Sequence, residues 1–428
     1  MIWLAAAFPA ALAQPGGQSQ GLLARYAGAE LPAWLRVGGE ERVRLEALGG
    51  VGFTPSSNAY LLQRFRLNMD ATPLPWLRFS FQAQDSRVFL TNVSPAPSSQ
   101  NNPLDLRLGF VQVGDAEAGW ISVRGGRQSL SFGEGRLVAD PNWSNVGRTL
   151  DGVRVTVHHR GLRLDVFSGA SDRISTDGFD LPAPGQHFHG VNGILDRLVP
   201  NAVVEPYVFW RLEHDIRGEK TAPGHLDTKT AGVRWAGKLP ARMDYSLELA
   251  LQRGRQAGEP VNAWAGHWVI GHTLPEPRHR PRFYAEFNRA SGDSDPRDGM
   301  HGAFDPLFPS AHDKFGIADQ FTWTNSIHAR TGLQYRLRPD LMLGSAYNSF
   351  WLADRRDGLY SGGKLWLASN GLQGAHIGQE LDVQLQWNAT RLTVVDLGFG
   401  HIFPGAFLRH AQRGSAYDCF FLGITQKF

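Results

Sequence analysis

The chain has 428 residues, of which 42% are hydrophobic and 19% charged, and its formal net charge is only +3. After residue 13 no segment approaches the roughly 20 consecutive apolar residues that a membrane-spanning helix needs, which excludes a helical membrane protein. A transmembrane β-barrel remains open, because its strands alternate apolar and polar residues and average out as mildly hydrophilic.

The first residues, MIWLAAAFPAALAQ, are apolar and end in Ala11-Leu12-Ala13. This small-x-small pattern predicts a signal peptide over residues 1–13 and export of the protein, although the usual basic residues before the apolar stretch are missing. Residues 14–33 are predicted to form a short periplasmic segment. No linker or charge run divides the remainder, so residues 34–428 are predicted to form a single domain.

Alternation with period two, which is typical of strands with two different faces, recurs along this domain, and helical periodicity is essentially absent. Leu61, Phe65 and Leu67, for example, alternate with Arg64 and Arg66. The pattern predicts eighteen strands, at residues 34–47, 60–71, 76–88, 104–113, 119–129, 150–158, 162–170, 187–195, 202–213, 227–236, 242–254, 262–273, 281–291, 324–337, 341–353, 376–387, 391–403 and 416–428.

The predicted connections alternate between short and long. Short turns at one rim, long loops at the other and an even strand count indicate an 18-stranded antiparallel transmembrane β-barrel with short periplasmic turns and long extracellular loops. Phe420, Leu422, Ile424 and the terminal Phe428 share one face of the last strand, and tryptophans near strand ends suit interfacial girdles. A barrel of this size has a lumen wide enough for an aqueous channel.

One glycine-broken stretch is rich in arginine. Residues 126–155 read GRQSLSFGEGRLVADPNWSNVGRTLDGVRV. Arginine presents a planar fork that binds carboxylates two bonds at a time, so such a cluster suits a polyanion that carries carboxylates. The alternative is that these arginines pair with acidic neighbours in a structural network. The overall ratio of 37 arginines to 6 lysines also follows from a GC-rich genome.

This stretch resembles the hallmark of the alginate-export family of outer-membrane β-barrels. Residues 290–321, ASGDSDPRDGMHGAFDPLFPSAHDKFGIADQF, resemble a later loop of the same family, and the likeness runs from about Arg36 to Phe428. The resemblance implies an 18-stranded barrel in the outer membrane of a Gram-negative bacterium, with an arginine-rich constriction that passes an anionic polysaccharide. The resemblance also implies a set of site residues in this chain, which are Arg127, Arg136, Arg148, Asp151 and Arg154. Strand parity adds Arg64 and Arg66 to this set.

The phase of one strand conflicts with this assignment, because Arg127 alternates in step with Ile121 and Val123, which are predicted to face lipid. A β-bulge at Gly125-Gly126 would turn Arg127 inward. The loop 130–149 is predicted to fold across or into the mouth with Trp143 as its anchor. We further expect Asp151 to hold neighbouring arginines by bidentate pairing.

Other constellations predict little chemistry. Asp293, Asp295 and Asp298 fail the EF-hand pattern, and a turn with Asx hydrogen bonds is preferred to a calcium site. His187 and His189 share a face without an identified third ligand. Cys419 has no partner and is interpreted as a filler residue. No catalytic residue, metal site or cofactor is expected, and the protein is not expected to be an enzyme.

The leading hypothesis is a passive, anion-selective outer-membrane channel that exports an alginate-like, uronate-containing polysaccharide. An anion-selective uptake porin for small organic acids or acidic oligosaccharides is the nearest alternative; an outer-membrane enzyme and a secreted sugar-binding sandwich are disfavoured. Expected partners are the polysaccharide, outer-membrane lipid and lipopolysaccharide, and the outer-membrane assembly machinery. Periplasmic proteins of polymer synthesis or modification are candidate partners, and nucleic acid is not.

Overall fold

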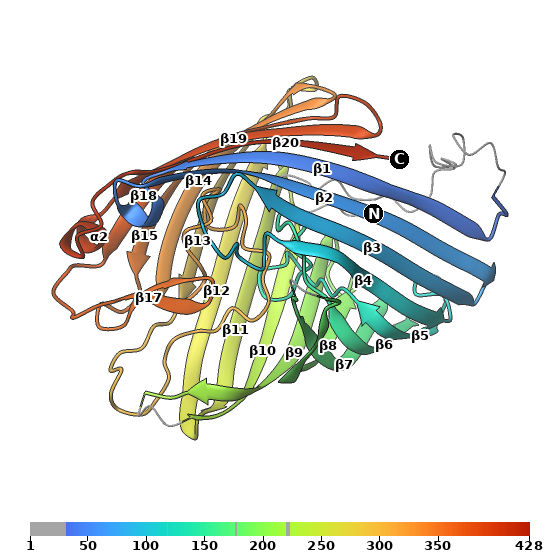
Figure 1. The fold of residues 1–428 in the computed structure, drawn as a ribbon, viewed down its shortest axis with the longest axis horizontal. Helices are drawn as coiled ribbons and strands as arrows, with labels where there is room; N and C mark the ends of the chain where they lie inside the picture. The colour runs from blue at the N-terminus through green and yellow to red at the C-terminus, as the bar shows by residue number, and fades with distance from the viewer. Residues whose placement is uncertain (1–30, 118, 176–177, 220–222) are drawn as a thin grey trace.

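The computed structural model describes residues 31–117, 119–175, 178–219 and 223–428 (Figure 1). The signal peptide predicted for residues 1–13 and most of the predicted segment 14–33 lie outside the described residues. No helix among the described residues is both long and apolar enough to cross a membrane.

Eighteen strands of the described chain form one closed antiparallel barrel. Each strand pairs with the next along the chain, apart from the small hairpin β16–β17, and β20 pairs with β1 to complete the circle (Figure 1). The barrel strands are β1 (Leu35–Gly49), β2 (Ser57–Leu74), β3 (Leu77–Phe89), β4 (Asn102–Val113), β5 (Ile121–Gln128), β6 (Leu150–His159), β7 (Leu162–Arg173), β8 (Leu181–Leu195), β9 (Ala202–Arg217), β10 (Pro223–Leu239), β11 (Met243–Gln256), β12 (Glu259–Thr273), β13 (Arg282–Ala290), β14 (Ser326–Arg338), β15 (Leu341–Leu352), β18 (His376–Trp387), β19 (Thr393–Pro404) and β20 (Tyr417–Lys427). The predicted fold class and strand count are therefore confirmed.

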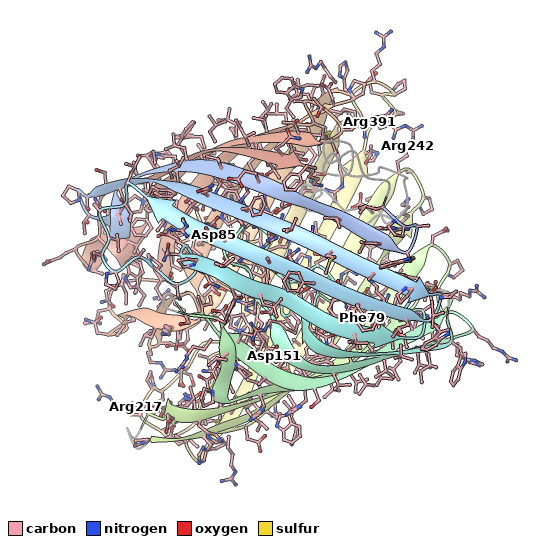
Figure 2. The ribbon with its side chains drawn as sticks, turned by 45° about the vertical axis from the view of Figure 1, so that its right-hand side comes forward. Phe79, Asp85, Asp151, Arg217, Arg242 and Arg391 are labelled. Carbon is pink, nitrogen blue, oxygen red and sulfur yellow. The ribbon has the colours of Figure 1, made fainter. Side chains whose placement is uncertain are left out.

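The alternation in the sequence becomes the two faces of the barrel wall. In β1, the apolar Val43 and Leu45 are exposed on the outer face, whereas Arg42 and Arg44 between them are buried on the inner face. Phe79 of β3 likewise lies on the outside (Figure 2). Apolar side chains thus face lipid and polar ones face the lumen, as a spanning barrel requires.

The connections alternate as predicted at most positions, with two exceptions at the long-loop end. β9 ends at Arg217 and β10 begins at Pro223, where the predicted strands left the longer connection 214–226. The turn between β11 and β12 has only two residues, Ala257 and Gly258, where the predicted strands left the longer connection 255–261. Both turn residues have positive φ, at 49° and 87°, which is the conformation of a tight hairpin whose twist matches its strands. The strands therefore pair farther toward this rim than the apolar pattern alone indicates.

Three short elements at the long-loop end were not predicted. The 3-10 helix η1 (Val51–Phe53) follows β1, and the helix α2 (Ala406–His410) lies between β19 and β20. The hairpin of β16 (Gly358–Ser361) and β17 (Lys364–Ala368) lies within the predicted loop 354–375. None of them alternates over enough residues to give a sequence signal.

Two of the long loops fold inward and pack against each other. Residues 129–149, between β5 and β6, meet residues 291–325, between β13 and β14, where Val138 pairs with Phe308 in a parallel bridge. The Ala139 amide donates to the Phe308 carbonyl at 2.9 Å, and the Phe308 amide donates to the Leu137 carbonyl at 2.8 Å. Phe132, Leu137, Phe304, Phe315 and Trp323 from these loops belong to a buried apolar cluster. The lumen therefore has a packed core of its own and is not an open pore.

Candidate functional site

The inner wall at β1 and β2 carries a group of arginines that bind one inward loop. Arg42 lies directly opposite Arg64 in the strand register. The Arg42 Nη1 donates to the Asn142 carbonyl at 2.6 Å, and the Arg64 Nη1 donates to the same oxygen at 2.9 Å. Both guanidinium groups also donate to the Ser144 carbonyl, at 3.1 and 3.0 Å. We call residues 140–146 the strap, because this segment lies across the arginines.

A septum in the lumen is built around Trp143 of the strap. The Arg44 guanidinium lies 3.5 Å from the centre of the indole, and the His312 ring stacks on it at 3.6 Å with only 5° between the planes. Because the Arg44 guanidinium and the His312 ring both lie within 3.6 Å of the indole centre, they must occupy opposite faces of the indole. Asp319 accepts a hydrogen bond from the His312 ring nitrogen at 2.8 Å. The septum therefore joins the wall, the strap and the second inward loop.

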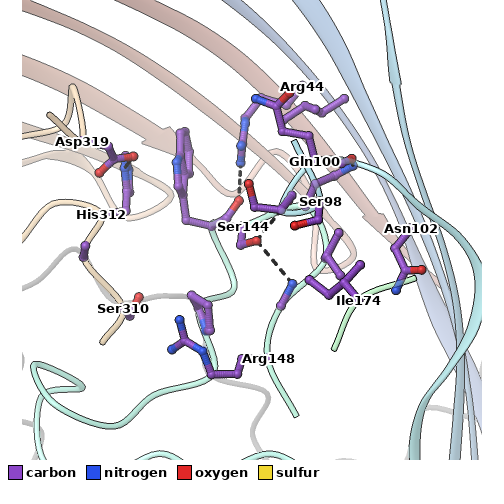
Figure 3. A pocket seen from close by; sticks show the side chains of 18 of the residues that line it. Arg44, Ser98, Gln100, Asn102, Ser144, Arg148, Ile174, Ser310, His312 and Asp319 are labelled. Atoms are coloured by element: carbon purple, nitrogen blue, oxygen red, sulfur yellow. Dashed lines mark hydrogen bonds and ion pairs between the residues drawn. The ribbon is translucent and has the colours of Figure 1, made fainter. Parts of the chain in front are cut away.

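The septum separates two cavities. The outer cavity, of about 580 Å³, reaches Leu48 and Tyr417 at the long-loop end of the barrel, and Figure 3 shows Arg44, Ser144, Arg148 and His312 around it. The inner cavity, of about 450 Å³, reaches Lys427 at the short-turn end. Four residues line both cavities. They are the septum residues Arg44, Trp143 and His312, together with Ser310. A path through the barrel therefore passes this point.

The charges that line the two cavities are mixed. The outer cavity is lined by Arg44, Arg107 and Arg148 together with five carboxylates, and the inner cavity by six basic and six acidic side chains. The outer carboxylates are Glu46, Asp105, Asp172, Asp180 and Asp319. The arginines therefore do not give the lumen a simple positive potential, and most of them have acidic partners.

Two of the predicted site residues line the cavities. Arg136 lies at the inner cavity and pairs with Glu286 at 2.7 Å, with both side chains almost fully buried. Arg148 lies at the outer cavity and donates to the carbonyls of Ala139 and Pro309 at 3.4 and 3.2 Å. Burial lowers the pKa of Arg148 to about 10, so its guanidinium stays charged at neutral pH. Arg148 therefore brings positive charge to the outer cavity.

Glu134 ties the loop 129–149 to the far wall. Arg234 donates to it at 3.1 Å, and Arg136 and His267 lie within 3.5 Å of it. Burial alone would raise the pKa of Glu134, but His267, Arg234 and Arg136 outweigh burial and hold the pKa well below its usual range. The loop is therefore held by a charged carboxylate that Arg234, Arg136 and His267 surround.

The predicted bulge at Gly125-Gly126 is wrong. The pairing of β5 with β4 and β6 runs without a register shift through Arg127, although Gly126 has a φ of 121°. Arg127 makes the expected bidentate pair with Asp151, with both bonds at 2.9 Å, and also donates to the carbonyls of Leu106 and Asp180. Neither Arg127 nor Asp151 is among the residues that line the two cavities.

The other predicted arginines are also engaged. Arg64 pairs with Glu40 at 2.6 Å and is fully buried under the strap; Arg66 bonds to Gln84 at 2.6 Å. Arg154 projects inward, pairs with Asp165 at 2.8 Å and lies over the Phe132 ring of the inward loop. The structural alternative, arginines paired with acidic neighbours, is therefore correct for most of the predicted group.

Sequence reasoning missed Arg42, Arg44 and Arg107. The strand parity that selected Arg64 and Arg66 also applies to β1, where Arg42 and Arg44 alternate with Val43 and Leu45. Arg107 shows a weaker form of the same signal, because Asp105 and Arg107 alternate with Leu106 and Leu108, but a register shift between β3 and β4 gives the rest of β4 the opposite phase. Arg107 pairs with Asp140 of the strap.

The acidic turn after β13 behaves mainly as a turn. Asp293 accepts from the Asp295 amide at 3.0 Å, and Asp298 accepts from the Met300 amide at 2.7 Å, as Asx turns require. Among the described residues, one group of three could hold a metal ion, and its donor atoms lie within 4.8 Å of one another. It consists of Glu219, Asp293 and His301, so it shares only one residue with the predicted set.

Several solved structures share this fold, and one of them is described as the outer-membrane protein OpdK of Pseudomonas aeruginosa. OpdQ of Pseudomonas aeruginosa is 11% identical, with a TM-score of 0.62, and the alignment covers 92% of this chain and 97% of that one. OccAB2 of Acinetobacter baumannii is 11% identical, with a TM-score of 0.63 and coverage of 92% and 98%. OpdK of Pseudomonas aeruginosa, solved with vanillate, is 12% identical, with a TM-score of 0.58 and coverage of 92% and 98%.

A comparison with curated protein sequences finds no match. The family model described as alginate export matches residues 33–421, which is nearly all of the described barrel. Together with the closed barrel and its lipid-facing apolar surface, this match identifies an outer-membrane channel protein of a Gram-negative bacterium. The chain belongs to the alginate export family.

Proposed function

We propose that this protein is a passive channel that exports an anionic, uronate-containing polysaccharide across the outer membrane. The observation that carries the proposal is the row of guanidinium groups on one wall strip, at Arg42, Arg44 and Arg64, beside the point where the two cavities meet. Such groups bind carboxylates in a planar, bidentate manner. Membership of the alginate export family supports the same cargo.

Two arginines carry the positive charge that a passing anion would meet. The guanidinium groups of Arg42 at the inner cavity and Arg148 at the outer cavity have only carbonyl and amide oxygens as hydrogen-bond acceptors among the described residues, and only the main-chain amide of Arg148 donates to a carboxylate, that of Asp140. The carboxylates on the same walls keep the net attraction weak. A channel needs this balance, because cargo that binds too tightly does not leave.

A second candidate function is uptake of small organic acids. The observation in its favour is the occlusion of the lumen, which leaves two cavities of about 580 and 450 Å³ and a septum in place of a wide pore. OpdK, which shares the fold, was solved with vanillate, a small aromatic carboxylate. Uptake and export differ in the size of the cargo and in direction.

Planar-bilayer recordings on the purified protein separate these functions. For export, the current should prefer anions, and uronate oligomers should block it more strongly when added at the short-turn side. Block by vanillate-sized acids at lower concentrations than by uronate oligomers would favour uptake. A preference for cations, together with no block by either ligand, would refute both. Lipopolysaccharide, the assembly machinery and periplasmic polymer-synthesis proteins remain proposed partners.

A further inference from the structure

The strap is held to the wall by its main-chain carbonyls. Five consecutive carbonyl oxygens, those of residues 142–146, each accept a hydrogen bond from a wall side chain. Arg42 and Arg64 bind the first and third, and Arg44 binds the second at 2.7 Å. Ser86 binds the fourth and Gln84 the fifth, both at 2.8 Å. The wall strip, formed by Arg42, Arg44, Arg64, Gln84 and Ser86, thus donates hydrogen bonds to a row of acceptor oxygens.

The strap lies outside the strands of the barrel. The strap takes part in no strand ladder, so these carbonyls are satisfied by donors from β1, β2 and β3. Residues 142–146 form a turn and bends, so their carbonyls converge, and the Arg64 Nη1 binds those of both Asn142 and Ser144. The wall strip is therefore a compact track of donors that can hold a chain of closely spaced acceptors, and in this structure the strap occupies it.

The strap does not provide a hydrogen-bond acceptor for every arginine N–H group of the track and its neighbours. The Nε atoms of Arg42, Arg64 and Arg107 and the Nη2 of Arg66 are buried and have no acceptor among the described residues. All four side chains are at least nine-tenths buried. A buried guanidinium N–H without an acceptor is costly, so a ligand with more acceptor oxygens would suit the track better than the strap does.

A carboxylate is such an acceptor. Unlike a neutral carbonyl, a carboxylate carries a charge opposite to that of the guanidinium and can accept two parallel N–H···O bonds from it. Without the strap, and hence without Asp140, the strip keeps Arg42, Arg44, Arg64, Arg66 and Arg107 against Glu40 and Glu46. The uncovered strip is therefore positive, in contrast to the mixed charge of the occluded lumen.

We propose that residues 140–146 are an autoinhibitory strap whose carbonyls stand in for cargo, and that a polyuronate chain opens the channel by replacing the strap on the track of Arg42, Arg44, Arg64, Gln84 and Ser86. The proposal rests on the proposed export of a uronate polymer. Trp143 holds the strap in place, because its indole stacks on His312 of the second inward loop. Displacement of the strap breaks this stack and joins the two cavities.

Thiol labelling tests the displacement directly. Val146 of the strap is buried, as is Cys419, the single cysteine of the chain. The test protein is Val146→Cys in a Cys419→Ser background, reconstituted in vesicles and treated with a membrane-impermeant thiosulfonate. A galacturonate oligomer should raise the labelling rate about tenfold or more, and a neutral oligosaccharide of equal length should not. Ala250→Cys in the same background, buried outside the strap, should stay protected throughout.

The outcomes separate the two proposals. If the oligomer blocks current but leaves the labelling of Val146→Cys unchanged, the strap proposal is wrong and the export proposal stands. If the oligomer neither binds nor blocks, both fall. In case Val146→Cys disturbs the fold, heat-dependent gel migration reports the folded barrel. His312→Ala then provides a second test: it should raise the open fraction in the native Val146 background, whereas His301→Ala in the same loop should not.

Discussion

Replacing Trp143 by alanine removes the centre of the septum. The indole loses its stack with His312 at 3.6 Å, which is worth roughly 0.5–1.5 kcal/mol, and its contact with the Arg44 guanidinium at 3.5 Å, worth about 0.5–2 kcal/mol. A combined loss of about 1–3.5 kcal/mol shifts the balance between closed and open states by roughly 5- to 350-fold, since each 1.4 kcal/mol is tenfold. We expect a large rise in the conducting fraction.

Single-channel recording in planar bilayers measures this effect. Trp143→Ala should show longer openings and a higher mean conductance than the parent protein, because the two cavities then communicate without the indole between them. The matched control is Trp268→Ala, which removes an indole that is 38% exposed on the outer face of β12. Equal conductance of Trp143→Ala and the parent, with both folded, would refute the assignment of the septum.

Three further predictions concern charge. Arg42→Gln should shift the reversal potential in a salt gradient away from anion preference, because Arg42 has no carboxylate partner, whereas Arg127→Gln, which breaks a pair outside the cavities, should leave it unchanged; equal shifts would contradict this distinction. Arg136→Met leaves the Glu286 carboxylate buried and should lower the free energy of unfolding in urea by about 3–5 kcal/mol, part of which Glu286→Gln should restore in the double variant. Burial, with help from Asp293, raises the pKa of Glu219 to about 7, above its ordinary value of 4.5. Stability that is present below pH 4.5 is therefore lost as the pH rises toward 7, and Glu219→Gln should raise the thermal midpoint at about pH 8 but not at about pH 4; equal gains at both would exclude this titration.

The barrel could be predicted because its signal is local. A strand that faces lipid on one side and the lumen on the other must alternate every second residue, whatever its neighbours are, and Val43, Leu45, Arg42 and Arg44 show this within one segment. The phase fails as a guide where the ladder is irregular, as at Arg107, and strand ends beyond the membrane carry too little apolar pattern to be located, as at Ala257.

The partners of the arginines could not be predicted, because they are distant in the sequence. Arg136 is 150 residues from Glu286, and Arg42 is 100 residues from the Asn142 carbonyl that it binds. The arginine-rich stretch predicted a positive constriction. A sequence shows the charge of each arginine, but it does not show which carboxylate will pair with that arginine in the folded protein. The inward packing of loop 129–149 was foreseen only as a mouth loop anchored by Trp143; its contact with loop 291–325 was not.

The sequence by itself therefore determined the alternating wall, the strand count and the family, because each depends on residues that are close together in the chain. The tertiary structure alone decided which guanidinium groups stay without a carboxylate, where the septum lies and what covers the wall strip. These features depend on which strands and loops meet in the lumen, since the energy of a buried charge is set by the partners around it and not by its own segment.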